Sequence, residues 1–217
     1  SGSIINLTNL LETVSAFPKE KAPIIEKNNN EYAYGILTSG TTGNPKYVVV
    51  THQNLLDTYY SWGSVYHLSS TDVHLQMAAI GFDVFIGDWV RALCSGAQLV
   101  LCPKETLLQP KVLYDLIVTH EITCAEFVPA TLRGLLNFLE QKALRLEQFR
   151  LMICGSDQWS MDEYRRIKRR CLSKARVINS YGLSEATIDS TYFEETDDTA
   201  PVLPATSLVP AGKPFPH

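Results

Sequence analysis

The 217-residue sequence lacks a long hydrophobic run and an excess of basic charge. No apolar stretch approaches the roughly 20 residues that a membrane-spanning helix requires, and the N-terminus shows neither the basic start nor the apolar core of a signal peptide. Lys and Arg number 19 against 23 Asp and Glu, which gives a formal net charge of −4. Such a balance disfavours nucleic acid as a partner. We therefore expect neither a membrane nor a nucleic-acid partner.

The cysteines are few, odd in number and widely spaced, and no Cys-x-x-Cys pair occurs. This spacing excludes a disulfide scaffold, and no His and Cys residues show the spacing of a zinc site. Most of the cysteines lie in apolar segments, so we predict buried, reduced thiols in a cytoplasmic protein. The five residues are Cys94, Cys102, Cys124, Cys154 and Cys171.

Short apolar runs alternate with segments of helical periodicity from Tyr32 onward. This alternation predicts an α/β fold, with a mostly parallel sheet covered by helices on both faces. The predicted strands are Tyr32–Leu37, Tyr47–Thr51, Val73–Met77, Gln98–Leu101, Thr123–Phe127, Arg150–Ile153 and Arg176–Asn179, the first two as buried strands. The predicted helices are Gln53–Tyr66, Val84–Leu93, Lys111–His120, Ala130–Glu140 and a helix from the Ser160–Glu163 capping box to about Cys171.

The composition divides the chain into three parts. Residues 1–30 look peripheral, and their first three residues resemble the remnant of an expression tag. Residues 31–195 form the predicted core. Residues 196–217 are rich in Pro, Thr and Ala, and they read as a linker to a missing remainder.

The segment from Thr38 to Lys46 has the composition of a phosphate-binding loop. Gly40 and Gly43 lack a Cβ, so their backbone amides can approach a phosphate closely. The loop has no P-loop or dinucleotide-binding spacing, and a plain polar turn is the alternative. The remaining donors are the Lys46 ammonium and the hydroxyls of Thr38, Ser39, Thr41 and Thr42.

Three motifs in this order resemble those of the adenylate-forming superfamily. Tyr34–Lys46 is similar to its phosphate loop, Asn179–Glu185 (Asn-Ser-Tyr-Gly-Leu-Ser-Glu) to a second motif, and Gly81–Asp83 to one of the amino-acid-activating members. The similarity is greatest to adenylation domains of nonribosomal peptide synthetases. It implies a flavodoxin-like subdomain of the enzyme core. Tyr47 departs from the family pattern, which usually has glycine there, and Leu183 replaces a frequent proline.

The resemblance implies that ATP and an amino acid yield aminoacyl-AMP and pyrophosphate, and that a carrier-protein domain with a phosphopantetheine arm then accepts the acyl group. Lys46, Thr42 and Glu185 would be catalytic, and Glu185 would hold Mg²⁺, a hard cation that prefers oxygen ligands. Asn179 and Tyr181 would face adenine. The other residues implied to hold ATP are Thr38, Ser39, Gly40, Thr41, Gly43, Gly155, Ser156 and Gly182.

The resemblance also implies an amino-acid pocket in which Asp83 pairs with the α-ammonium group and Gly87 leaves room for a long side chain. Glu126 lies in an apolar strand, where an unpaired carboxylate is costly to bury. Together with Asp189 it favours a cationic ligand. The implied pocket residues resemble those of ornithine-selecting domains, with lysine or arginine as alternative substrates; they are Asp83, Val84, Gly87, Glu126, Met152, Cys154, Ser180, Ile188 and Asp189.

Other readings stay open. Glu126 can instead pair with a protein cation such as Arg133, or face water. The chain can also be a degenerate, non-catalytic binding or scaffold module of the same fold. Family members carry a mobile C-terminal lid with a lysine that contacts the adenylate, and no residue here matches it. We therefore expect the isolated chain to be a recognition lobe with little activity.

Overall fold

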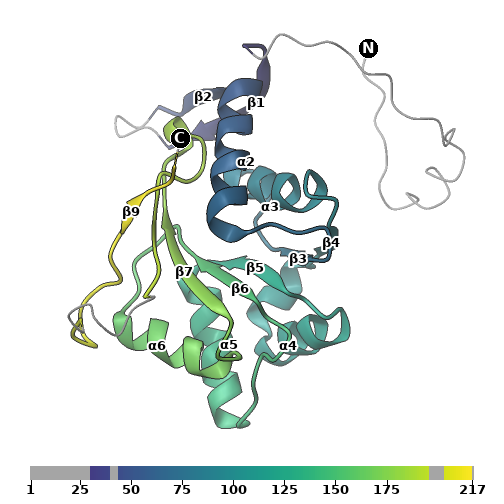
Figure 1. Cartoon of the computed structure of the whole chain (residues 1–217), viewed down its shortest axis with the longest axis vertical. Helices are drawn as coiled ribbons and strands as arrows, with labels where there is room; N and C mark the ends of the chain where they lie inside the picture. Colours follow the sequence, from purple (N-terminus) through teal and green to yellow (C-terminus); the bar gives the residue numbers. More distant parts are fainter. Residues whose placement is uncertain (1–29, 40–43, 196–202, 217) are drawn as a thin grey trace, which may run out of the picture.

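The computed structural model of the chain describes residues 30–39, 44–195 and 203–216 (Figure 1). The predicted peripheral segment 1–29 lies outside the described residues. No helix in the described ranges has both the length and the apolar character needed to cross a membrane.

The described residues form a seven-stranded sheet in the order β4-β3-β5-β6-β7-β8-β9. The first five of these strands are parallel to one another. Taken in chain order, these five lie as 2-1-3-4-5, which is the flavodoxin-like arrangement, so the predicted fold class is confirmed. The strands are β3 (Val73–Gln76), β4 (Gln98–Leu101), β5 (Cys124–Phe127), β6 (Leu151–Cys154), β7 (Arg176–Tyr181), β8 (Thr191–Phe193) and β9 (Lys213–Pro214).

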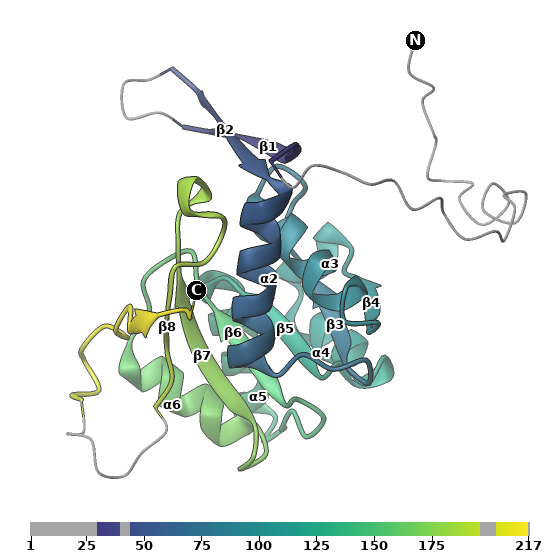
Figure 2. The same ribbon diagram turned by 45° about the horizontal axis from the view of Figure 1, so that its top comes forward.

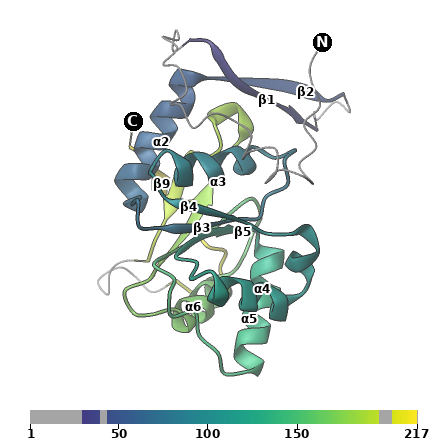
Figure 3. The ribbon, with the colours of Figure 1, turned by 90° about the vertical axis from the view of Figure 1, so that its right-hand side faces the viewer.

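Helices cover both faces of the parallel strands (Figure 3). Buried residues alternate along the strands: Cys124 packs in a cluster with α2, whereas Ala125 packs in the larger cluster with α4, α5 and α6. This period of two places one apolar set on each face, which explains why the strands read as nearly continuous apolar runs. The helices are α2 (His52–Tyr66), α3 (Asp83–Leu93), α4 (Pro110–Thr119), α5 (Pro129–Gln141) and α6 (Met161–Arg170), with 3-10 turns η2 (Lys104–Leu108) and η3 (Ser184–Ala186).

Local sequence signals set the helix starts. Ser160 caps α6 in a reciprocal capping box with Glu163, as predicted. Pro110 and Pro129 occupy the first turns of α4 and α5, where a missing N–H costs no hydrogen bond. Thr51 caps α2 through a similar box with Asn54. Each predicted helix is present, and its bounds differ from the prediction by only a few residues.

The first two strands, β1 (Tyr32–Thr38) and β2 (Lys46–Thr51), were predicted as buried, and this was wrong. They pair antiparallel in a separate two-stranded hairpin, and their residues are mostly exposed or half-buried. The hairpin stands away from the main sheet at the start of α2 (Figure 2). Their apolar side chains mimic a buried strand in the sequence, because Leu37 and Tyr47 are apolar and yet exposed.

Residues 203–216, in the segment predicted to be a linker, pack along one edge of the sheet. β9 pairs antiparallel with β8, and β8 with β7. Val209 and Phe215 enter the two hydrophobic clusters. These strands are only three and two residues long, too short to leave a periodic signal in the sequence.

Three of the five cysteines are buried, as predicted. Cys94, however, is exposed and Cys102 is half-buried. All five are free thiols. Cys94 directly follows the last residue of α3, and the packing that buries the helix does not cover it.

Candidate functional site

A cavity of about 670 Å³ opens beyond the carboxyl ends of β5 and β7. Ligands of open α/β sheets gather at this edge. Loops after β6 and β7, the start of α3 and the chain around Leu208 form its walls. It is lined by Phe82, Asp83, Val84, Glu126, Ser156, Asp157, Gln158, Trp159, Asn179, Ser180, Tyr181, Gly182, Leu183, Ser184, Ile188, Asp189, Leu208, Val209 and Ala211.

A second cavity of about 270 Å³ adjoins the first, and its walls are more apolar. It lies between the segments that follow β3 and β5, where the strand order reverses. The two cavities share Phe82, Asp83, Val84, Glu126 and Ser156. Glu126 therefore lines both cavities.

The segment Asn179–Ser184, predicted to meet the nucleotide, forms one wall of the large cavity. The amide oxygen of Asn179 accepts a 2.7 Å hydrogen bond from the Trp159 indole, and its NH₂ group donates to the carbonyl of Pro210 at 2.9 Å. Both polar atoms of this side chain are thus engaged by the protein. Tyr181 is exposed and lines the cavity. The wall therefore offers a fixed amide beside an accessible aromatic ring.

Three non-glycine residues at this site have left-handed backbone angles, with φ of 68° at Ser156, 60° at Thr187 and 74° at Ile188. Such angles are uncommon for residues with a Cβ and tend to occur at functional sites. Ser156 and Ile188 both line the cavity. These angles could not be predicted from composition, because a left-handed angle at a non-glycine residue leaves no compositional signature.

Two predicted glycines are required by close packing. A Cβ on Gly155 would lie 2.6 Å from the Ser180 hydroxyl, and one on Gly182 would overlap the Ile188 carbonyl. Gly155 itself does not line the cavity, although it lies between Cys154 and the cavity residue Ser156. It sets the spacing of neighbouring strand ends.

Asp83 is the first residue of α3, and with Val84 it lines both cavities. A carboxylate in the first helical turn is favoured by the helix dipole. Tyr34, in β1, lies near enough that Asp83 and burial together raise its pKa. The start of α3 thus brings an acidic group under the hairpin.

A buried ion-pair cluster lies beside the cavities. The Arg91 guanidinium bonds to Asp88 at 3.0 Å and to Glu126, and it lies 3.6 Å from Asp189. The Trp62 indole donates to Asp189 at 2.8 Å. Glu126 therefore pairs with a protein cation, and the predicted candidate Arg133 instead pairs with Glu163.

Burial dominates the electrostatics of this cluster. It raises the pKa of Glu126 and that of Asp88, although Arg91 acts in the opposite direction on both. Burial likewise raises the pKa of Asp189. The attraction of the carboxylates outweighs burial at Arg91, whose pKa is raised. Arg91 therefore stays positively charged, and its charge favours the ionised form of the carboxylates around it.

Sequence reasoning missed Arg91, Asp88 and Trp62. Arg91 lies in an apolar helix and is 1% exposed. A charged residue within the apolar face of a predicted helix was the available signal, but its partners come from β5 and the η3 region, which only the fold brings together.

Six of the nine predicted pocket residues line the large cavity, and three do not. Gly87 is buried, and a Cβ there would lie 3.3 Å from Trp62 and 3.4 Å from Arg91, so protein atoms occupy the space next to it. Met152 and Cys154 belong to the larger hydrophobic cluster, with α4 to α6. Glu185, predicted to bind metal, is exposed on η3 and is not among the cavity residues.

The predicted phosphate loop joins β1 to β2 at the tip of the hairpin. Thr38 and Lys46 are paired across the two strands, and Lys46 is exposed. Ser39 is also exposed. Gly40, Thr41, Thr42 and Gly43 lie outside the described residues. The structure thus places the loop's two flanks side by side.

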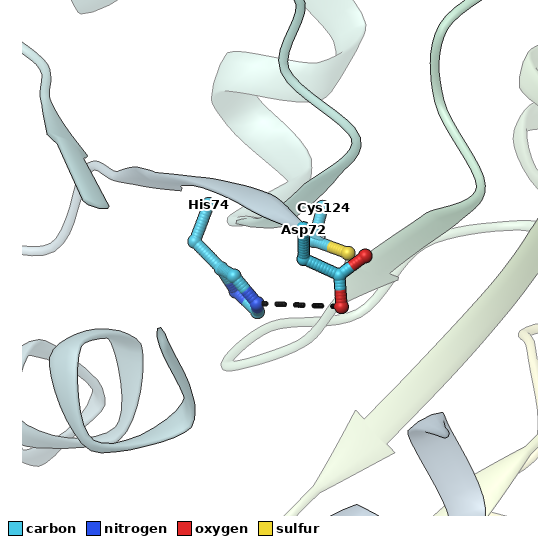
Figure 4. A group of neighbouring side chains, drawn as sticks. All are labelled: Asp72, His74 and Cys124. Carbon is cyan, nitrogen blue, oxygen red and sulfur yellow. Dashed lines mark ion pairs between the residues drawn. The ribbon is translucent and has the colours of Figure 1, made fainter. Parts of the chain in front are cut away.

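A further polar cluster is buried near the amino ends of β3 and β5, away from the cavities (Figure 4). It consists of Asp72, His74 and Cys124. Its spacing admits a metal ion, but Asp72 is already held by two guanidinium nitrogens of Arg150, one at 2.5 Å. Burial lowers the pKa of His74 to about 4, so its imidazole is neutral. The adjacent Arg150 charge disfavours a dication, and we interpret the cluster as structural.

Comparisons with known proteins identify the family of this chain. The sequence matches the AMP-binding enzyme family over residues 4–217, which includes the segment that looked peripheral. Tyrocidine synthase 3 of Brevibacillus parabrevis is 44% identical over 85% of this chain, and gramicidin S synthase 2 of Brevibacillus brevis is 40% identical over 85%. The chain spans only 3% and 4% of the lengths of these synthases.

Solved structures show the same fold. The nonribosomal peptide synthetase FmoA3 (S1046A) superposes with a TM-score of 0.77 at 26% identity, covering 87% of this chain and 19% of that one. The Vibrio cholerae adenylation domain AlmE, in complex with glycyl-adenosine-5'-phosphate, gives 0.75 at 25% identity, covering 98% and 40%. This chain belongs to the AMP-binding enzyme family, and its sequence and fold are those of the N-terminal core of nonribosomal peptide synthetase adenylation domains.

Proposed function

We propose that this chain binds ATP and an amino acid, and that the protein it belongs to joins them as aminoacyl-AMP. A carboxylate oxygen of the amino acid attacks the α-phosphorus of ATP, and the bond to the leaving pyrophosphate breaks. The observation that carries the proposal is that one cavity is lined both by the Asn179–Ser184 segment and by Asp83 with the buried carboxylates. Structures of FmoA3 with AMPPNP and of AlmE with glycyl-adenosine-5'-phosphate support it.

ATP would lie with its adenine against Tyr181 and Asn179, near Ser156 and Gly182, and with its phosphates toward Thr38, Ser39 and Lys46. The donors of residues 40–43 would complete the phosphate site. Phosphoryl transfer depends mainly on positioning and on stabilising charge. Hydroxyls, backbone amides and one ammonium group suit that purpose.

Glu185 would hold Mg²⁺. Mg²⁺ sites of this kind commonly use one or two carboxylates, with phosphate and water oxygens filling the other positions. A single exposed glutamate on η3, next to the cavity segment Gly182–Ser184, fits that donor set. The ion would neutralise charge on the phosphates.

The amino acid would be basic, with ornithine favoured over lysine or arginine. Asp83 would pair with its α-ammonium group, and Glu126, which faces both cavities, with its side-chain ammonium. When all three buried carboxylates are ionised, Arg91 leaves two formal negative charges unpaired. A ligand cation would reduce this excess.

We further propose that a phosphopantetheine thiol on a carrier domain accepts the aminoacyl group, and that a C-terminal lid subdomain closes over the site. The great length of the matching synthases supports neighbouring domains of this kind. Acyl transfer would release AMP as the thioester forms.

Calorimetry tests the proposal directly. The purified protein is titrated with ATP and Mg²⁺, and then with ornithine or leucine. We expect nucleotide binding, and at least tenfold tighter binding of ornithine than of leucine. Glu126→Gln should abolish that preference, whereas Asp157→Asn, at an exposed position of the cavity wall, should retain it.

Each contrary result would reject a different part of the proposal. Absence of nucleotide binding would reject adenylation and favour a non-catalytic module. Nucleotide binding with equal affinity for ornithine and leucine would reject only the basic substrate. An unchanged preference in Glu126→Gln would remove Glu126 from substrate selection.

A further inference from the structure

Arg91 is the centre of the buried charges beside the cavities. It is 1% exposed, and its Nη2 atom donates to Asp88 at 3.0 Å and to Glu126. Its guanidinium carbon lies 4.6 Å from the centroid of the Trp62 ring, and the same indole donates to Asp189. One side chain thus contacts carboxylates from α3, β5 and the segment after η3.

The cluster is not internally satisfied. Among the buried side-chain atoms of the described residues, Asp88 Oδ2 and Arg91 Nη1 have no hydrogen-bond partner. Arg91 Nη1 lies 3.6 Å from Asp189, which is an ion pair without a hydrogen bond. Three carboxylates face one guanidinium, so negative charge remains at the boundary that Glu126 shares with both cavities.

We propose that Arg91 is a positioning residue for selecting the amino-acid side chain: it holds Glu126 and Asp189 together, and it keeps Glu126 ready to receive a ligand cation. This inference rests on the proposed function and adds a residue outside the predicted pocket set. Removing a buried cation leaves its partners uncompensated. Without Arg91 the carboxylates would take up protons rather than attract a ligand.

The proposal predicts a link between ligand charge and protons. Burial raises the pKa of Glu126 and the charge of Arg91 lowers it, so a ligand ammonium must displace any proton that Glu126 holds in the empty site. An amine of the Lys type has an ordinary pKa near 10.4 and stays charged. The titratable or charged groups around Glu126 and Arg91 are Asp88, Asp189, Tyr66, His74 and Cys154.

The test measures binding of ornithine and of leucine from pH 6 to pH 9.5 by calorimetry, with ATP and Mg²⁺ present. In the wild type, the ratio of ornithine to leucine affinity should rise up to tenfold per pH unit and level off above the pKa of Glu126. In Arg91→Met the levelling should move up by at least one pH unit, and the ratio at pH 7 should fall at least tenfold. Leucine shares the α-ammonium and carboxylate groups, so the ratio reports the side-chain site alone.

Two further variants separate positioning from folding. Arg91→Lys keeps the charge, so levelling should stay within half a pH unit of the wild type, while the ratio falls because one ammonium cannot bridge three carboxylates. In Asp88→Asn/Arg91→Met one carboxylate leaves together with the cation, so this variant serves if Arg91→Met does not fold. Carbon-13 NMR of the Glu126 carboxyl group, without ligand, should show a higher pKa in either Met variant.

The outcomes distinguish the two proposals. If the wild type prefers ornithine and both Met variants show its pH profile and its Glu126 carboxyl titration, the role of Arg91 is rejected and the basic substrate stands. If the wild type binds ornithine no better than leucine at any pH, the basic substrate is rejected, and with it the selective role of Arg91.

Discussion

The Trp62 indole donates a 2.8 Å hydrogen bond to Asp189, although the two residues are 127 positions apart. Trp62 is fully buried in α2, and Asp189 lies on the cavity wall. This bond ties the helix that follows the hairpin to the proposed amino-acid site. It also lowers the pKa of Asp189 against the larger effect of burial.

Replacing Trp62 with Phe keeps an aromatic ring and removes the N–H donor. Because Asp189 is buried, we expect the free energy of unfolding to fall by about 1–3 kcal/mol. Urea denaturation at neutral pH measures this change.

Trp89→Phe is the matched control. Trp89 is 39% exposed, and a substitution at such a position should change stability by about 0.5 kcal/mol or less. Equal losses in the two variants would show that ring size, rather than the hydrogen bond, determines the effect.

Replacing glycine with alanine should change the stability of the protein in opposite directions at Gly63 and Gly182. Gly63 lies within α2, and a Cβ there meets nothing within 4 Å, so Gly63→Ala should stabilise the protein by about 0.5–1 kcal/mol. A Cβ on Gly182 would overlap the Ile188 carbonyl and lie 2.6 Å from the Asp189 Cα. Gly182→Ala should cost about 1–3 kcal/mol and weaken nucleotide binding.

Thermal unfolding and titration with ATP measure these two effects. The Gly63→Ala variant should bind the nucleotide like the wild type, since Gly63 is not among the cavity residues. Destabilisation by Gly63→Ala would contradict the open space seen beside it.

His74 should make the free energy of unfolding depend on pH. Its pKa is about 4 in the folded protein, because burial and the charge of Arg91 disfavour protonation, against about 6.5 in an unfolded chain. Between these values the unfolded chain binds more protons, so stability is lost as the pH falls from 7 toward 4. The loss from this group reaches about 3 kcal/mol.

His74→Gln removes that contribution, so the difference in stability between the variant and the wild type should shrink or reverse as the pH falls. Urea denaturation at several pH values between 4 and 7.5 measures it. The exposed His120 provides the control, because His120→Gln should leave the pH dependence as in the wild type. A constant difference at position 74 would contradict a buried neutral imidazole.

Much of the fold could be predicted from the sequence, because parallel strands covered on both faces leave short apolar runs, and helix caps leave local signals. The Ser160–Glu163 capping box is one such signal. The exposure of β1 and β2 could not be predicted, because apolar composition does not reveal whether a strand joins the main sheet. The short strands β8 and β9 leave no periodic pattern.

The candidate site was predictable only in part, for a related reason. Motifs such as Asn179–Glu185 are contiguous in sequence, and the structure places most of that segment on the cavity wall. The pairing of Arg91 with Glu126 joins residues 35 positions apart, and nothing local specifies it. The apolar strand around Glu126 indicated that an unpaired carboxylate would be unfavourable there. It did not identify Arg91 as the partner.

Helix α2 joins the hairpin to the wall of the cavity. Thr51 is both the last residue of β2 and the N-cap of α2, so no loop separates them. The 15-residue helix, about 22 Å long, then runs from the base of the hairpin toward the sheet (Figure 2). Since Trp62 on this helix is bonded to Asp189, a single helix joins the base of the hairpin to the wall of the proposed amino-acid site.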